Sequence, residues 1–383
     1  MVALYVHIPF CRSRCAYCAF NTYAGLESLI PAYGEALCAE IRTVAQDLSC
    51  NVAQDLSCVA ATVYFGGGTP SLLPVDVLAR ILDCLRERFP LLPDAEVTLE
   101  ANPGTVDRAY LQAARELGVN RLSLGVQSVH EDELRLLGRI HSWEDAVKAV
   151  EAARAAGLDN VNLDLIYGLP GQTLARWQET LEAALSLEPD HLSLYALTLE
   201  EGTPLQGQVA RGELPPPDDD AAAEMYEWAE ARLARAGYVH YELSNWARSE
   251  RYFCRHNLTY WYNEPYLGFG AGASSWWGGR RWTNVRHPEE YIRQLAAGES
   301  VAEEVEEIGP RLEMGETMMM GLRLVNGVSD ARFRARFGVG LADVFGGALV
   351  RLSDLGLLEW DGQTARLTPC GRLLGNWVFR EFV

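Results

Sequence analysis

The sequence is short of basic residues and has no long apolar run. Its 383 residues include 33 Lys and Arg against 52 Asp and Glu, which gives a formal net charge of −19 at pH 7. Nucleic acids and anionic lipid surfaces are bound by clustered Lys and Arg, and the chain has no such cluster. No apolar stretch reaches the roughly 18 residues that a membrane-spanning helix needs. We therefore expect no nucleic-acid partner and no integral membrane protein.

Signs of export are missing as well. The N-terminus lacks a basic segment followed by an apolar run and a small-residue cleavage site, so no signal peptide is predicted. The nine cysteines are odd in number and unevenly spread, unlike a disulfide framework. These features predict a cytoplasmic protein, because thiols stay reduced in the cytoplasm.

Three of the cysteines stand close together near the start of the chain. Cys11, Cys15 and Cys18 have C-x3-C-x2-C spacing. Three thiolates in so short a loop can hold three corners of an iron–sulfur cube and leave the fourth iron open. A zinc site is the alternative, because His7 could complete a Cys3His set. However, His7 lies in an apolar, strand-like run, and zinc sites usually pair two cysteines with a distant second pair. The spacing therefore favours a [4Fe-4S] cluster whose open iron can bind a substrate or cofactor.

The first half of the chain alternates short apolar runs with helical patterns. The predicted strands cover residues 3–8, 61–66, 96–101, 121–127, 161–167 and 191–199. Six β/α units in succession predict an α/β fold with a parallel sheet curled into a partial (β/α)6 barrel, whose site lies at the carboxyl ends of the strands.

Three domains are expected. Residues 1–215 would form the barrel and residues 216–308 an α+β extension. Residues 309–383 would form a small winged-helix-like module of helices and a terminal hairpin. An identical seven-residue tandem at 44–50 and 52–58 reads as a local duplication. A metal role for its Cys50 and Cys58 is disfavoured, because no other ligand cluster is nearby in sequence.

Polar residues follow successive strands. Gly66-Gly67-Gly68-Thr69-Pro70 follows the second strand, Glu100 ends the third, Gln127 ends the fourth and Asp164 lies in the fifth. A carboxylate in a strand that is buried on both sides needs a partner. Polar groups at the ends of successive strands of one barrel therefore predict the rim of a ligand site.

The motif C-x3-C-x-aromatic-C, with Tyr17 as the aromatic residue, resembles the radical S-adenosylmethionine (SAM) superfamily. The blocks above resemble its oxygen-independent coproporphyrinogen III dehydrogenase branch over nearly the whole chain. The resemblance implies that SAM chelates the open iron, and that one electron from the cluster cleaves SAM to a 5′-deoxyadenosyl radical. The residues that it implies for the SAM site are Tyr5, Tyr17, Gly67, Gly68, Thr69, Glu100, Gln127, Arg139 and Asp164. Arg139 would neutralise the SAM carboxylate, and Glu100, Gln127 and Asp164 would hold the ribose and amino-acid parts.

Two features depart from the dehydrogenase. Phe20 stands where the dehydrogenase has a fourth cysteine, and the chain starts almost at the first strand, without the N-terminal extension. Both departures match the related haem chaperones of the HemW type, as does His256-Asn257-Leu258-Thr259-Tyr260-Trp261. This H-N-x-x-Y-W segment implies haem contact through His256, Tyr260 and Trp261, with Cys254 as the alternative axial ligand.

The resemblance thus implies a haem chaperone that binds a [4Fe-4S] cluster, SAM and haem. Its partners would be apo-haemoproteins, respiratory ones among them, and an electron donor for the cluster. Two alternatives stay open at this point. One is oxidative decarboxylation of coproporphyrinogen propionates, and the other is a radical-SAM reaction on another substrate.

Overall fold

Six parallel strands form the centre of the molecule. A computed structural model describes residues 1–48 and 58–383. The strands are β1 (Val2–Ile8), β4 (Ala60–Gly67), β5 (Leu91–Ala101), β6 (Arg121–Gln127), β7 (Val161–Tyr167) and β8 (His191–Ala196). They pair in this order, each parallel to the next. The helices between them are α1 (Ile30–Asp47), α2 (Val75–Arg88), α3 (Arg108–Glu116), α4 (Glu131–Leu136), α5 (Trp143–Ala155) and α6 (Leu174–Ser186). The predicted partial (β/α)6 barrel is therefore confirmed.

Local sequence signals explain where the helices begin and end. Ser142 accepts a hydrogen bond from the Asp145 N–H, and the Asp145 side chain accepts one from the Ser142 backbone, which completes the capping box of α5. Gly157 follows this helix with a φ of 83°, a left-handed conformation that suits glycine. Thr173 caps α6 by a single hydrogen bond, which its side chain accepts from the Arg176 N–H.

The two faces of the barrel strands differ in polarity. Alternate residues point to opposite faces of a strand. On β6, Leu122, Leu124 and Val126 belong to the apolar core under the outer helices. The residues between them face the barrel interior, as do their counterparts on the neighbouring strands. These buried interior residues are polar: Thr62, Thr98, Arg121, Ser123, Asn162, His191 and Ser193. The interior is therefore a polar lumen rather than a second apolar core.

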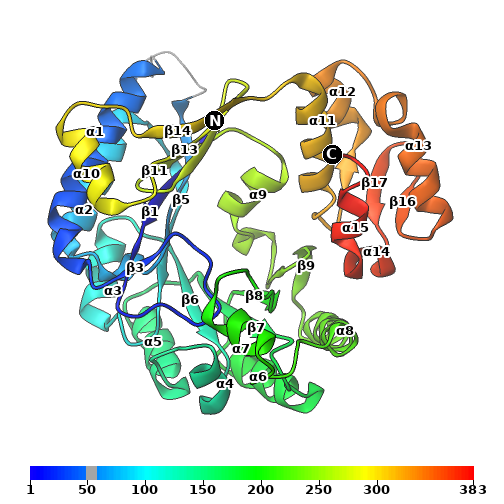
Figure 1. The fold of residues 1–383 in the computed structure, drawn as a ribbon, viewed down its shortest axis with the longest axis horizontal. Coiled ribbons are helices and arrows are strands. Elements are labelled where there is room, and N and C mark those ends of the chain that lie inside the picture. Colours follow the sequence, from blue (N-terminus) through cyan, green and yellow to red (C-terminus); the bar gives the residue numbers. More distant parts are fainter. Residues whose placement is uncertain (49–57) are drawn as a thin grey trace.

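The sheet continues beyond the barrel on both sides. β11 (Tyr266–Phe269) pairs parallel with β1, and β12 (Ser274–Trp277), β13 (Arg280–Asn284) and β14 (Ala302–Glu307) follow it outward. At the opposite edge, β10 (Asn245–Ala247) and β9 (Val239–Glu242) lie beside β8. The associated helices are α7 (Pro204–Ala210), α8 (Asp219–Arg235), α9 (Arg255–Trp261) and α10 (Pro288–Ala296). Strands from 216–308 thus flank the barrel strands in one sheet (Figure 1). The domain boundary at 215 stays a prediction.

The C-terminal residues form a module with a core of its own (Figure 1). Its elements are α11 (Pro310–Gly321), β15 (Val328–Ser329), α12 (Asp330–Phe337), α13 (Leu341–Asp354), β16 (Leu358–Trp360), β17 (Thr364–Leu367), α14 (Pro369–Leu373) and α15 (Gly375–Phe379). The expected hairpin is present as β16 and β17 but is not terminal. The chain continues into a helix because Thr368 accepts a hydrogen bond from the Gly371 N–H and Pro369 occupies the first helical turn.

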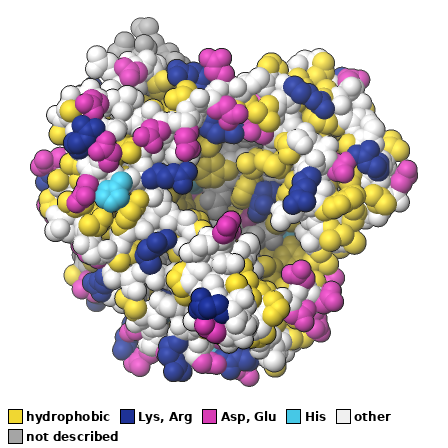
Figure 2. Space-filling view, viewed as in Figure 1, with side chains coloured by type: hydrophobic (Ala, Val, Ile, Leu, Met, Phe, Trp, Pro, Cys, Tyr) yellow, Lys and Arg dark blue, Asp and Glu magenta, His cyan; other side chains and the backbone are white. Residues whose placement is uncertain are grey.

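A hollow separates the barrel from the C-terminal module, and hydrophobic side chains gather along its walls (Figure 2). Helix α9 lies between these two parts of the molecule (Figure 1). Within the described residues, no helix is long and apolar enough to cross a membrane. Cys50 and most of the second copy of the tandem lie outside the described residues.

Candidate functional site

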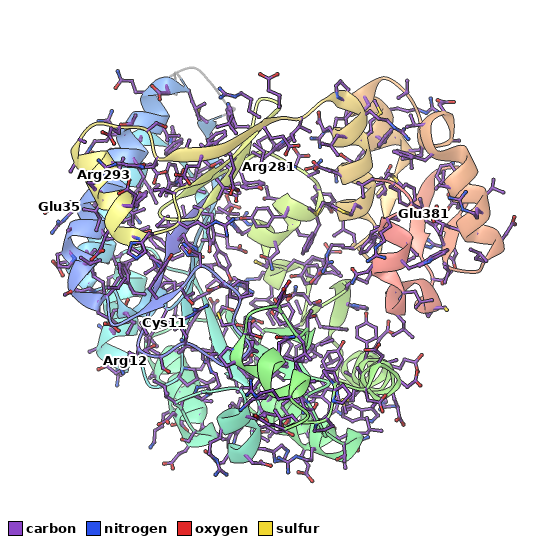
Figure 3. The ribbon with its side chains drawn as sticks, viewed as in Figure 1. Cys11, Arg12, Glu35, Arg281, Arg293 and Glu381 are labelled. Atoms are coloured by element: carbon purple, nitrogen blue, oxygen red, sulfur yellow. The ribbon has the colours of Figure 1, made fainter. Side chains whose placement is uncertain are left out.

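The three clustered cysteines lie on a loop that follows β1. Cys11 ends the short strand β2 (Phe10–Cys11), which pairs with β3 (Tyr23–Ala24) and so closes the loop that carries Cys15 and Cys18. Figure 3 labels Cys11 and the neighbouring Arg12 there. Backbone hydrogen bonds tie the loop to the barrel, because the Ala16 N–H donates to the Leu137 carbonyl over 2.9 Å. The cysteines are therefore held by the fold at the carboxyl ends of the strands, as predicted.

Each of the three sulfurs has a polar neighbour. The Thr69 hydroxyl donates to Cys11 Sγ over 3.6 Å, and Arg139 Nη1 donates to Cys15 Sγ over 3.3 Å. Cys18 Sγ lies 3.8 Å from the Thr22 hydroxyl. Burial raises the pKa of the Cys11 thiol to about 11. Bound iron would have to offset the free-energy cost of deprotonating this buried thiol, as metal ions do for the thiols that they coordinate.

One cavity of about 400 Å³ gathers most of the predicted site residues. Those that line it are Cys11, Cys15, Tyr17, Cys18, Gly67, Gly68, Glu100, Gln127, Arg139 and Asp164. Thr69 lines a neighbouring cavity of about 300 Å³, together with Cys15 and Arg139. Tyr5 lines neither of these cavities, and its hydroxyl lies 2.9 Å from His7 Nδ1. Residues far apart in sequence thus converge on a single space beside the cysteine loop.

Glu100 and Asp164, two of the carboxylates that line the cavity, are partly buried and have hydrogen-bond partners. Glu100 accepts hydrogen bonds from the Tyr64 hydroxyl over 2.6 Å and from the Gly67 N–H over 3.2 Å. Asp164 accepts from the Ser123 hydroxyl over 3.1 Å and from the Asn162 amide over 2.8 Å. Burial raises the pKa of Glu100 to about 7 and raises that of Asp164. Such carboxylates can accept further hydrogen bonds from ligand hydroxyls or from a ligand ammonium group.

The glycine motif brings the backbone close to the cysteine loop. Gly67 has a φ of 114°, which strongly favours glycine. A Cβ on Gly68 would lie 2.7 Å from the Phe10 carbonyl oxygen and 2.8 Å from Cys11 Sγ. A side chain at Gly68 would collide with the cysteine loop, so glycine allows the backbone to approach Cys11 closely, whereas a Cβ on Gly67 would meet the His7 ring.

Arg139 is anchored by three partners. Besides Cys15, it donates to the Gly125 carbonyl over 2.7 Å and to the Asn102 side chain. Asn102 in turn donates to the Thr69 hydroxyl over 2.8 Å. The sequence reading missed Asn102, although it stands only two residues after Glu100 at the same edge of the sheet.

His7 has both ring nitrogens engaged. Besides its contact with Tyr5, its Nε2 lies 2.9 Å from the Asn21 carbonyl oxygen. This arrangement does not support the zinc alternative. Among the residues that the structure describes, no three His, Cys, Asp or Glu side chains are placed to hold one metal ion. The donor set fits a cubane cluster instead, because separate thiolates hold its separate corners.

Helix α9 carries the residues expected to contact haem, and their haem contact stays a prediction. His256 is 1% exposed; its Nδ1 lies 2.8 Å from the Thr62 hydroxyl and its Nε2 lies 2.9 Å from the Tyr260 hydroxyl. Cys254 is fully buried and donates to Glu96 over 3.7 Å. Both ring nitrogens of His256 are therefore engaged, and the Cys254 sulfur is closed off from solvent, in this arrangement.

The aromatic residues of α9 are packed as well. The Arg323 guanidinium lies 4.3 Å from the centre of the Trp261 ring, and Tyr260 meets Tyr266 edge to face. From the same helix, Asn257 lines the main cavity. The segment thus packs against β4 of the barrel through His256, which contacts Thr62 and Tyr64.

Several cavity residues were missed by the sequence reading: Tyr64, Arg121, Ser123, Asn162, Ser193, Tyr195 and Asn257. For the strand residues among them, the sequence contained a pattern that could have indicated their position in the cavity. They stand at every second position along the strands, in step with Gln127 on β6 and with Asp164 on β7. Asn257 had no such signal, because its position depends on how α9 packs.

The chain is similar to known proteins over nearly its whole length. Residues 5–184 match the family model described as "Radical SAM superfamily", and residues 310–374 match "HemN C-terminal domain". A Mycobacterium tuberculosis protein named "Heme chaperone HemW" is 41% identical over 387 residues, covering 99% of this chain and 94% of that protein. A Bacillus subtilis protein of the same name is 37% identical, covering 100% of this chain and 99% of that one.

A solved structure matches the whole fold. It is described as "Coproporphyrinogen III oxidase (HemN) from Escherichia coli is a Radical SAM enzyme", and it superimposes with a TM-score of 0.85 at 26% identity. The match covers 100% of this chain and 89% of that one.

Proposed function

The chain belongs to the HemW family of the radical SAM superfamily, and from this membership we propose a haem chaperone that binds a [4Fe-4S] cluster, SAM and haem. The observation that carries the proposal is the convergence of Cys11, Cys15 and Cys18 with most of the predicted SAM residues on one cavity. When bound, the cluster supplies an open iron and single electrons. The cytoplasm, where thiols stay reduced, suits these cysteines.

Different residues of the cavity would bind different groups of SAM. Arg139, anchored beside Cys15, offers a positive charge to the SAM carboxylate. Gly67 and Gly68 line the cavity together with the three cysteines, where their backbone would face the SAM amino group. Glu100 and Asp164 accept hydrogen bonds from the polar groups of SAM, and their own partners keep them in place. Tyr17 lines the same cavity from the cysteine loop.

For haem, the mouth of the cavity offers flat apolar surfaces. Phe20 and Tyr195 line the cavity and are 69% and 42% exposed. Aromatic rings of this kind suit the face of a porphyrin. An electron donor would approach the cluster over the exposed residues Arg12, Ser13 and Arg14 of the cysteine loop. Haem would pass from this protein to apo-haemoproteins, respiratory ones among them.

The second candidate function is coproporphyrinogen oxidation, which the match to the Escherichia coli enzyme favours. Phe20 counts against it, because the side chain at this place in the cavity is a phenyl ring rather than a thiol. A radical-SAM reaction on another substrate is the third candidate.

One experiment separates these candidates. Anaerobically reconstituted protein is titrated with haem, and separately incubated with coproporphyrinogen III, SAM and a reductant. We expect stoichiometric haem binding, transfer of haem to an apo-haemoprotein, and no protoporphyrinogen. Steady formation of protoporphyrinogen would overturn the chaperone proposal.

A further inference from the structure

Arg121 is a buried cation that lines the main cavity. It opens β6 and is 2% exposed. It faces the lumen, because it lines the main cavity together with Ser123 and Gln127 of the same strand. Among the described residues, its guanidinium forms no hydrogen bond and no ion pair, and its Nε is buried without a partner.

The nearby carboxylates do not supply that partner. Glu100 and Asp164 are held by the hydroxyl and amide groups described above. Glu96 accepts hydrogen bonds from the backbone N–H groups of Arg255 and His256, each over 3.0 Å, and so caps the start of α9. A buried charge without a direct partner is costly. The side chain is therefore placed to receive an anion that enters the cavity.

We propose that Arg121 binds a carboxylate of a ligand seated in this cavity. An arginine fork matches the two oxygens of a carboxylate and can bind both at once. The proposal deepens the proposed function and rests on it, because both proposed ligands carry carboxylates: haem has two propionates and SAM has one α-carboxylate.

The position of Arg121 favours the haem propionate. Arg121 pairs with Thr98 and Ser123 pairs with Glu100, so Arg121 lies one interior position deeper than Glu100. Two residues of a strand span about 7 Å. The SAM carboxylate belongs near the cysteine loop, where Arg139 contacts Cys15. A propionate is a short, flexible side chain that ends in a carboxylate. It could extend into the barrel lumen while the porphyrin ring remains at the mouth of the cavity.

The test compares ligands that differ only in their carboxylates. Haem and haem dimethyl ester are titrated into the reconstituted protein and followed by the Soret band. SAM and decarboxylated SAM are titrated by calorimetry.

We expect the wild type to prefer haem to its diester by about tenfold to a hundredfold, the range for a charge-assisted hydrogen bond. Arg121→Gln should bring that ratio close to one. Arg121→Lys keeps the positive charge but not the two-pronged guanidinium. Its preference for haem over the diester should therefore lie between those of the wild type and Arg121→Gln. Arg232→Gln, at an ion pair with Glu182 outside the cavity, is the matched control and should behave as wild type.

The outcomes are distinct. If Arg121→Gln instead weakens SAM but not decarboxylated SAM, the carboxylate is that of SAM. If the wild type prefers neither carboxylate form, or if Arg121→Gln keeps the wild-type preferences, the inference is overturned. Loss of the haem preference in Arg14→Gln alone would overturn it too, because Arg14 also lines the cavity. A wild type that binds no haem at all would refute the chaperone proposal, while the SAM titrations still decide the role of Arg121.

Discussion

The His256 imidazole stacks on the Tyr64 ring, with the ring centroids 4.9 Å apart. The Tyr64 hydroxyl in turn donates a hydrogen bond to the Glu100 carboxylate. Helix α9 is thereby connected to the proposed SAM site through two side chains. The H-N-x-x-Y-W segment supports the cavity from within, whatever else it does in this family.

This contact leads to a prediction for His256. Because both ring nitrogens are engaged, His256→Ala should leave the position of the Soret maximum of bound haem unchanged. It should lower the free energy of unfolding by about 2 kcal/mol, because two buried hydrogen bonds and a stacked ring are lost. Spectroscopy and urea unfolding measure the two effects. His287→Ala, whose side chain is half exposed, serves as control. A clear Soret shift would show that α9 rearranges and that His256 binds iron.

The cluster is predicted to depend on three cysteines. Replacing Cys11, Cys15 or Cys18 by Ala should each cause a sharp loss of iron and sulfide, because a cubane cluster needs its three protein ligands. Iron and sulfide analysis after anaerobic reconstitution tests this. Cys370→Ala is the control, since this exposed cysteine lies in the C-terminal module. Four irons retained in Cys15→Ala would refute the assignment.

SAM affinity is predicted to depend on the cavity carboxylates Glu100 and Asp164. Glu100→Gln and Asp164→Asn should each weaken SAM binding by roughly ten- to hundredfold, because each removes a charged hydrogen-bond acceptor. Calorimetry on reconstituted protein measures the change. Asp159→Asn, an exposed surface carboxylate paired with Arg251, should have no effect. Unchanged affinity in both cavity variants would move the SAM site elsewhere.

Glu40 should make stability depend on pH. It lies in α1, accepts a hydrogen bond from the Gly270 N–H over 2.8 Å, and burial raises its pKa to about 7. An unfolded Glu titrates near about 4.3. Between these values the folded protein keeps a proton that the unfolded chain has lost, so the free energy of unfolding falls as the pH rises.

Glu40→Gln removes this titration. The decrease in unfolding free energy between about pH 5 and about pH 8 should then be smaller than in the wild type, by roughly 1–3 kcal/mol. Urea unfolding at the two pH values measures it, with the exposed Glu35→Gln as control. Equal pH dependence in wild type and Glu40→Gln would contradict the prediction.

Much of the site could be predicted because its signals are local. The three cysteines lie within eight residues, so their spacing alone indicates a shared cluster. Glu100 and Gln127 end predicted parallel strands, and such ends meet at one edge of a barrel. The capping box at Ser142 specifies where α5 begins from four adjacent residues.

Only the tertiary structure determined how the side chains of α9 pack and whether Arg121 has a hydrogen-bond partner. The Thr62–His256 hydrogen bond joins residues 194 positions apart, so no local pattern could show that the imidazole is engaged. Arg121 follows the alternation of β6, but whether it has a partner depends on where Glu96, Glu100 and Asp164 direct their oxygens. Short-range rules assign a residue to a face of its strand or helix. Long-range packing determines which buried groups are satisfied and which remain available to a ligand.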